Sequence, residues 1–427
     1  MATGTLHAQR IKKGICCLLL GSLLVISAGA ISVDWTGELN TTFHKGTYTD
    51  IFAAGQTGDG GYLLGGFGYG NGNDSALLIK TDSKGVEQWN TTPGGDCVVA
   101  VVPLEDGGAI VGAYTVDGGF LTVTDWANAT GASSLSRIDA AGTPLWNVTI
   151  DGLRLTGLDR LPDDKIAVSG WLWKHAGETE TFVGIYDLAG TEVRAETYPE
   201  RAARTIATAA DGSIFVGGTD GPTVEGSVSS WIMKTDASGK EMWAKDLADR
   251  ILLTSLAVDD GYLLGGSMTS INNETGRATV ITDAWAAKTD DAGVIEWEQK
   301  IPGFEVHAMA EIPGTGYVLA GRWGSVPQVQ VIDYNGKVVD GQVWNAWKGR
   351  LSSVFLTQSG EIVSAGWSRM DGNADGWVVS SAAVQDAGMS TETPTPSQTG
   401  TPEAPGFLIA TAGTALAIAG FLRYGRK

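Results

Sequence analysis

One motif recurs along most of the chain: a glycine-flanked apolar strand, an Asp-x-x-Gly turn, and a strand that carries tryptophan. The clearest copies span residues 60–90, 212–247 and 261–301. Units of about 40 to 55 residues that hold several short strands are typical of propeller blades. The 60 glycines and the low charged fraction of 18% agree with turn-rich β structure. The repeat therefore predicts an all-β ring of blades.

The turn within each unit has a defined chemistry. Asp82 can cap its own turn, and Gly85 can adopt a positive φ angle. The same pair recurs at Asp139/Gly142, Asp187/Gly190, Asp236/Gly239, Asp290/Gly293 and Asp333/Gly336. These turns predict six complete hairpins. A seventh unit, 352–383, ends before its tryptophan strand.

Tryptophan stands four residues after the turn glycine in four of the six units. A large flat ring at a fixed strand position suits packing between blades, so we assign these residues a structural role. They are Trp89, Trp146, Trp243 and Trp297, with Arg194 and Asp340 in their place in the third and sixth units.

The strand that the last unit lacks is predicted near the N-terminus. Residues 32–39 align with 240–247, including the spacing Trp-x-x-acid-Leu that begins at Trp35. An outer strand supplied from the other end of the chain leaves the closed ring without an open edge. We therefore predict a seven-bladed β-propeller over residues 31–388, with a velcro closure through Trp35.

Both ends of the chain are typical of targeting segments. Basic residues precede an apolar run at 15–26 and a cleavage-type sequence at 27–30, which predicts a signal peptide over residues 1–30. A Thr/Pro-rich stalk follows the propeller at 389–404. The last segment, 405–427, is apolar with a basic end, and an ordinary anchor helix is one interpretation. Its apolar run would span roughly 24 Å, which is short for a bilayer core of about 30 Å.

Export would expose six Asn-x-Ser/Thr sequons to glycosylation. They begin at Asn40, Asn73, Asn90, Asn128, Asn147 and Asn273. Cys97 is the only cysteine outside the signal peptide, so an intramolecular disulfide is excluded. The net charge of −19 argues against nucleic acid as a partner.

Signals for enzymatic chemistry are few, and we expect no catalytic residues and no cofactor. The histidines outside the signal peptide, His44, His175 and His307, show no metal-ligand spacing. Asp371, Asn373 and Asp375 match the start of a calcium loop, but Ala382 stands where a glutamate would complete it, which favours a plain turn. A quinoprotein dehydrogenase is disfavoured because its repeat places Gly four residues after Asp, against three here.

One strand position varies between units and is the candidate ligand surface. It holds Phe67, Tyr114, Trp171, Thr219, Ser267, Arg322 and Trp367 in the seven units. If these side chains reach one face of the ring, the aromatic residues and Arg322 form a stacking surface for sugars or polymers. The simpler interpretation, which we favour, is that the aromatic rings pack against the next blade.

Two resemblances add to these predictions. The units resemble the GGYxLxG...KTDxxGxxxW repeats of secreted archaeal and bacterial surface proteins, common in methanogens, which implies a propeller at the cell surface. The tail, with Pro405, Gly406 and Phe407 between stalk and apolar segment, resembles the archaeal PGF-CTERM sorting signal. That resemblance implies processing by an archaeosortase and attachment to a membrane lipid, and Leu408 departs from the glycine that many members carry there.

These observations favour a non-enzymatic binding propeller tethered to the outer face of the cell membrane, with a surface glycan or a protein as ligand. A structural component of the envelope is one alternative. A carbohydrate-active or redox propeller enzyme is the other.

Overall fold

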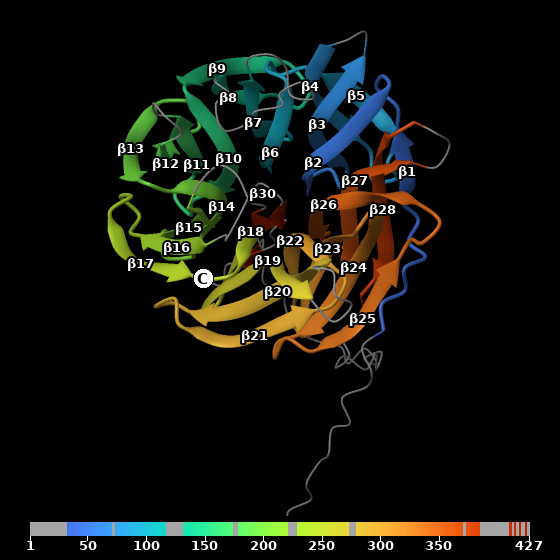
Figure 1. Ribbon diagram of the computed structural model, residues 1–427. Helices are drawn as coiled ribbons and strands as arrows, with labels where there is room; N and C mark the ends of the chain where they lie inside the picture. The colour runs from blue at the N-terminus through green and yellow to red at the C-terminus, as the bar shows by residue number, and fades with distance from the viewer. Residues whose placement is uncertain are drawn as a thin grey trace, which may run out of the picture.

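The computed structural model describes residues 32–70, 73–116, 131–173, 178–220, 229–272, 279–369 and 373–384, with eight residues between 410 and 424. Seven antiparallel sheets stand around a central axis (Figure 1). The predicted all-β, seven-bladed propeller is therefore confirmed. The predicted signal peptide and stalk lie outside the described residues, as does most of the predicted sorting signal. Within the described part, no helix has the length and apolar character needed to cross a bilayer.

Each blade has four strands, numbered from the axis outwards. The first three blades contain β2 (Tyr48–Gln56), β3 (Tyr62–Gly70), β4 (Asn73–Thr81) and β5 (Glu87–Thr91); β6 (Cys97–Pro103), β7 (Ala109–Val116), β8 (Gly131–Ile138) and β9 (Pro144–Asp151); and β10 (Leu153–Arg160), β11 (Ile166–Trp173), β12 (Thr179–Tyr186) and β13 (Glu192–Pro199). The next three contain β14 (Ala202–Thr208), β15 (Ile214–Thr219), β16 (Ser230–Thr235) and β17 (Glu241–Leu247); β18 (Ile251–Val258), β19 (Gly261–Asn272), β20 (Thr279–Asp290) and β21 (Ile295–Ile301); and β22 (Glu305–Ile312), β23 (Gly316–Trp323), β24 (Val326–Asp333) and β25 (Val338–Val343).

The seventh blade combines both ends of the ring. Its strands are β26 (Lys348–Leu356), β27 (Glu361–Arg369), β28 (Asp375–Ala383) and, outermost, β1 (Asn40–Phe43). The two-residue strands β29 (Ala410–Thr411), β30 (Thr414–Ala415), β31 (Ile418–Ala419) and β32 (Arg423–Tyr424) belong to the tail, where β30 pairs with β10 and β31 with β26.

The closing strand begins later than the sequence alignment predicts. Closure from the N-terminus is confirmed, but the strand is β1 rather than residues 32–39. Leu39, not Trp35, occupies the tryptophan position, because the Ser380 amide donates to the Leu39 carbonyl oxygen over 2.9 Å. Trp35 instead packs edge-on against Trp344, with the ring centroids 6.3 Å apart. The predicted alignment of residues 32–39 with residues 240–247 was therefore wrong by four positions. Trp35 packs against the sixth blade and does not occupy the tryptophan position of the seventh.

The recurring tryptophans join each blade to the next. Trp89 Nε1 donates to the carbonyl oxygen of Ala140 over 3.0 Å, and its ring lies against Gly142 in the turn of the second blade. Three equivalent bonds run from Trp146 to Leu188, Trp243 to Asp291 and Trp297 to Tyr334, over 3.1, 3.2 and 3.0 Å. In the third blade, where Arg194 replaces tryptophan, the Tyr198 hydroxyl donates to the Gly239 carbonyl oxygen.

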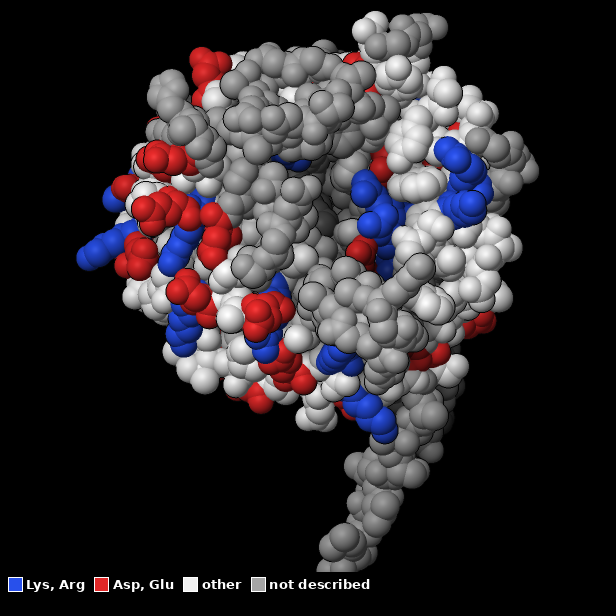
Figure 2. Space-filling view, viewed as in Figure 1, with Lys and Arg blue, Asp and Glu red and all other residues white. Residues whose placement is uncertain are grey.

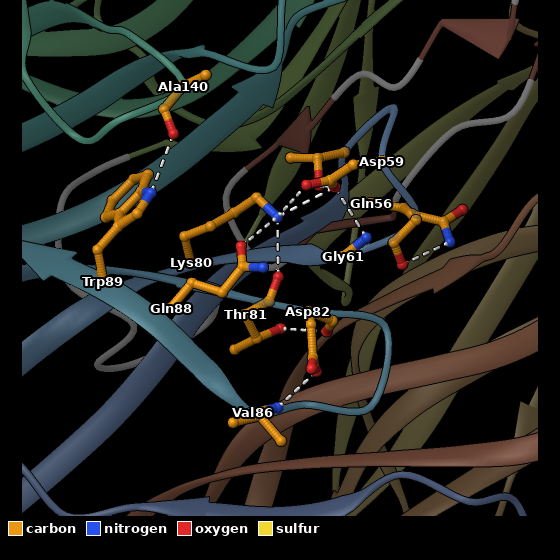
Figure 3. A network of polar contacts seen from close by, with 12 residues as sticks. Gln56, Asp59, Gly61, Lys80, Thr81, Asp82, Val86, Gln88, Trp89 and Ala140 are labelled. Atoms are coloured by element: carbon orange, nitrogen blue, oxygen red, sulfur yellow. Dashed lines mark hydrogen bonds and ion pairs between the residues drawn. The ribbon is translucent and has the colours of Figure 1, made fainter.

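A polar network of motif residues surrounds the turn in four of the seven blades, and Figure 3 shows that of the first blade. Lys80 is almost fully buried, and its Nζ donates to both carboxylate oxygens of Asp59 over 3.0 and 2.9 Å. Asp82 Oδ1 accepts the amide hydrogen of Val86 over 2.9 Å and so fixes the turn. Corresponding pairs are Arg137 with Asp106, Lys234 with Asp211 and Lys288 with Asp260. The repeated residues therefore hold the blades of the ring together.

Substitution of two glycines, Gly142 and Gly152, can distinguish the free-energy cost of a positive φ angle from the cost of displacing a tryptophan ring. Gly142 has φ +86° with Trp89 ring atoms 2.9 Å from an added Cβ, whereas Gly152 has φ +68° and open space around it. We expect Gly152→Ala to lower the free energy of unfolding by about 1–2 kcal/mol. Gly142→Ala should cost at least about 1 kcal/mol more, because the ring must move. Equal urea midpoints for the two variants would contradict the proposed inter-blade contact.

Candidate functional site

All seven inner strands carry a β-bulge at the same level. The bulged residue has no partner in the ladder to the second strand, and a bulge redirects the side chains around it. The bulged residues are Phe52, Val99, Thr156, Arg204, Leu253, His307 and Ser352. One level of the ring's inner wall is therefore lined by side chains that differ from blade to blade.

The variable strand position predicted from the sequence lies close to this level. Its seven residues all pair with the inner-strand residue two positions before the bulge. In chain order these partners are Asp50, Cys97, Arg154, Ala202, Ile251, Glu305 and Arg350. The predicted equivalence of Phe67, Tyr114, Trp171, Thr219, Ser267, Arg322 and Trp367 thus agrees with the strand register.

Three of the four aromatic residues at this position are buried within the blades. Phe67, Tyr114 and Trp171 are buried, with 1%, 4% and 0% of their surface exposed. Residues of the inner strand cover them: Phe52 stacks on Phe67 with centroids 6.0 Å apart, and Arg154 lies over both Tyr114 and Trp171 at 5.2 and 5.7 Å. These contacts favour packing, the simpler of the two interpretations, with the inner strand as the main partner.

Charged residues gather where the aromatic surface was expected. We call seven of them the inner-wall cluster: Asp50, Arg154, Arg204, Glu305, His307, Arg322 and Arg350. This group holds four arginines and two carboxylates, in which Arg322 pairs with Glu305 and Arg350 with Asp50, although the whole chain has a net charge of −19. Figure 2 shows basic side chains beside the hollow at the centre of the ring, with acidic side chains next to them, and side chains of both charges around the rim.

Asp50 and Arg350 join the first blade to the last. Arg350 donates to Asp50 Oδ2 over 2.8 Å, and the guanidinium lies over the Phe52 ring, 4.8 Å from its centroid. The Tyr48 hydroxyl donates to the same oxygen over 3.4 Å. Burial raises the pKa of Asp50 to about 6, although Arg350 and these hydrogen bonds act in the opposite direction.

Glu305 is held as a carboxylate by two basic neighbours. His307 and then Arg322 hold the pKa of Glu305 at about 2, against the effect of burial. Arg322 Nε donates to Glu305 Oε2 over 2.8 Å, whereas His307 Nε2 lies 3.6 Å from this oxygen, beyond hydrogen-bond distance. Burial lowers the pKa of His307 below its ordinary value of 6.5, so at neutral pH the positive charge beside Glu305 is that of Arg322.

Arg154 and Arg204 extend the positive side of the cluster. Burial lowers the pKa of Arg204 to about 10, and the charge of Arg154 acts in the same direction, so Arg204 remains cationic at neutral pH. Burial raises the pKa of the Cys97 thiol, Asp50 adds to the rise, and Arg350 and Arg154 oppose it. Three of the charged residues that act on this thiol, Asp50, Arg350 and Arg154, belong to three different blades.

The other predicted residues are distributed around the ring. Cys97 is a buried free thiol. Asp371 lies outside the described residues, and Asp375 Oδ1 contacts His44 Nδ1 at 2.6 Å. No group of three potential metal ligands occurs in the described residues. Arg322 joins the inner-wall cluster, whereas Trp367 packs against Tyr48 with centroids 5.7 Å apart.

Most of the inner-wall cluster is absent from the sequence predictions. Asp50, Arg154, Arg204 and Arg350 lie on the first strand of each unit, whereas the sequence comparison aligned the second strand. A bulge also breaks the two-residue alternation that identifies side chains on one face. An alignment of the seven first strands, with one extra residue allowed, would have brought these positions together.

No protein-family model matches the sequence, and no curated protein matches it. Among solved structures, the chain is similar to the C-terminal WD40 domain of Sif2, at 10% identity over 82% of this chain and 94% of that chain, with a TM-score of 0.49. It is similar to the Dos1 propeller at 10% identity over 81% and 94%, with a TM-score of 0.48. Sqt1 from Chaetomium thermophilum aligns at 14% identity over 78% and 84%, with a TM-score of 0.44. No function is transferred from these proteins.

Proposed function

We propose that this chain is a non-enzymatic binding propeller that takes an anionic ligand at the inner-wall cluster. Four arginines among two carboxylates, in a chain with a net charge of −19, are the observation that carries the proposal. Guanidinium groups recognise carboxylate, sulfate and phosphate groups through paired hydrogen bonds. An acidic glycan or an acidic protein segment is the ligand class that fits this chemistry.

Binding is favoured over catalysis because both carboxylates of the cluster are committed to arginines. Glu305 accepts from Arg322, and Asp50 accepts from Arg350. Acid and base catalysis by a carboxyl pair requires groups that can exchange protons with a substrate. A carbohydrate-active propeller that uses this carboxyl pair for acid–base catalysis therefore has less support in the described residues.

The same proposal places the propeller outside the cell. The N-terminal apolar segment supports export, and the stalk with Pro405, Gly406 and Phe407 supports a tether at the outer face of the membrane. Processing by an archaeosortase and attachment to a lipid would complete the tether. A retained C-terminal helix would place the ring on the same side of the membrane.

The test uses probes of matched shape and different charge. A polygalacturonate oligosaccharide, the same oligosaccharide with its carboxyl groups reduced to alcohols, and inorganic sulfate are titrated against the full chain by calorimetry. We expect the acidic oligosaccharide to bind more tightly than the neutral one, and Arg154→Gln to weaken its binding about 10- to 100-fold, as for the loss of a charged hydrogen bond.

Arg137→Gln is the matched control, because Arg137 pairs with Asp106 in the polar network of its blade rather than in the cluster. This variant should bind the acidic probe as the native chain does. Absence of binding to every anionic probe, or equal weakening by both substitutions, contradicts the proposal. Concentration-dependent self-association in place of binding would favour a structural envelope component.

A further inference from the structure

Three of the six sequons occupy one structural position. Asn90 and Asn147 each follow the tryptophan of an outer strand, and they pair with Ile79 and Ser136. Asn40 follows Leu39, which takes the tryptophan position in the seventh blade, and it pairs with Val379. The three asparagines therefore stand at equivalent points on the outer strands β1, β5 and β9. These strands belong to three consecutive blades of the ring: the seventh, the first and the second.

Each of these sequons presents both of its reactive residues to solvent. Asn40, Asn90 and Asn147 are exposed. The threonines two residues later, Thr42, Thr92 and Thr149, are exposed as well. Side chains two residues apart lie on the same face of a strand. Amide and hydroxyl thus share an open surface in all three blades.

The hydrogen bonds of the amides are compatible with a linked sugar. Asn40 uses its Oδ1, which accepts from Trp377 Nε1 over 3.0 Å. Asn90 Nδ2 donates to Glu87 over 2.6 Å, and Asn147 Nδ2 donates to Ser136 over 2.7 Å. An amide nitrogen carries two hydrogens, so one remains for these bonds when the other is replaced.

The remaining outer strands are protected in other ways. An outer strand leaves backbone groups unpaired along its edge, and charged side chains discourage another chain from pairing there. The outer strands β13, β17 and β21 each carry three charged residues, which would discourage such pairing. The edge of β25 is met by the N-terminal segment, since Val33 donates to Asp340 Oδ2 and Trp35 packs on Trp344.

In contrast, β1 has no charged residue, and β5 and β9 have one each. These three sequons therefore lie on outer strands that carry no more than one charged residue each. Leu145 on β9 is 56% exposed, which adds apolar surface to an unprotected edge. A hydrophilic glycan at each of these positions would prevent lateral pairing by bulk and hydration.

From this coincidence we infer that Asn40, Asn90 and Asn147 are N-glycosylated, and that the glycans cover the rim of the seventh, first and second blades. The inference rests on the proposed export of the chain. Lateral contacts with other molecules are then confined to the rim of the third to sixth blades and to the two faces of the ring.

Glycopeptide mass spectrometry on the full chain, produced in a glycosylating archaeal host and recovered from the cell envelope, tests the inference. We expect a glycan mass on the peptides that contain Asn40, Asn90 and Asn147. Export with these three peptides unmodified overturns the inference and leaves the proposed function standing. Retention of the chain inside the cell counts against both.

A matched set of variants tests the consequence of glycosylation. Thr42→Ala/Thr92→Ala/Thr149→Ala removes all three sequons, whereas the same triple change to serine preserves them. We expect the alanine variant to lose the three glycans and to self-associate in sedimentation velocity experiments, while the serine variant stays monodisperse. Identical sedimentation of the two variants overturns the protective role.

Discussion

Replacing Trp377 by alanine is expected to lower the free energy of unfolding by about 3–5 kcal/mol, the range for large aromatic residues removed from a core. The side chain is fully buried, and Trp344 and Trp347 pack edge-on against it at 5.2 and 4.5 Å. Its Nε1 also donates to Asn40 in the closing strand. The substitution therefore leaves a cavity and removes a hydrogen bond to the strand that closes the ring.

Trp323→Ala is the matched control for this experiment. It removes the same side chain from a site that is 60% exposed, so we expect a change of no more than about 1 kcal/mol. Chemical unfolding followed by circular dichroism gives both values, because the β signal does not depend on a single tryptophan. Similar losses for the two variants would show that closure does not rest on Trp377.

Arg350→Met is expected to destabilise the fold by about 3–5 kcal/mol, because it leaves the Asp50 carboxylate without its buried partner. The Asp50 side chain is 2% exposed, and the pair connects inner strands 300 residues apart in the chain. Asp50→Asn/Arg350→Met removes both charges, so it should recover most of the loss. Arg194→Met, which breaks an exposed pair with Glu196, should change stability by less than about 1 kcal/mol.

The pH dependence of stability provides a second measurement of this site. The folded pKa of Asp50, about 6, lies above its unfolded value near 3.8, so the unfolded state releases the proton first as pH rises. Stability contributed by this group is therefore greatest below about pH 4, falls between about pH 4 and 6 and is constant above, by an amount on the order of 3 kcal/mol. Asp50→Asn should remove this fall, and an unchanged pH profile of the urea midpoint would contradict the assignment.

The carboxyl group of Glu305 changes the stability with pH in the opposite direction. Its folded pKa of about 2 lies below the ordinary value of 4.5, so its stabilising effect is present above about pH 4.5 and is lost as pH falls toward 2. The two carboxyl groups differ because Asp50 is more completely buried, whereas Glu305 lies close to both His307 and Arg322. A comparison of Asp50→Asn with the native chain therefore isolates the Asp50 contribution.

The number of blades and the source of the closing strand were predictable from the sequence, because local signals encode both. Asp82 and Gly85 mark a turn by their own conformational preferences, and the alternation of apolar residues marks the strands beside it. The register of closure was not predictable. Trp35 and Leu39 are both apolar, and only packing decides which of them lies against Gly85 and which against Trp344.

The sequence by itself determined the repeating scaffold of this protein, since six units carry the Asp-x-x-Gly turn and four carry the tryptophan that packs on the next blade. Tertiary structure alone decided which residues from different units meet. Asp50 and Arg350 come together because the ring closes, and the inner-wall cluster forms because seven bulges occur at one level. Asn40 likewise occupies the same position on its blade as Asn90 and Asn147 only because the ring closes in this register. Contacts between distant units depend on closure and on strand register, and neither is encoded in any single unit.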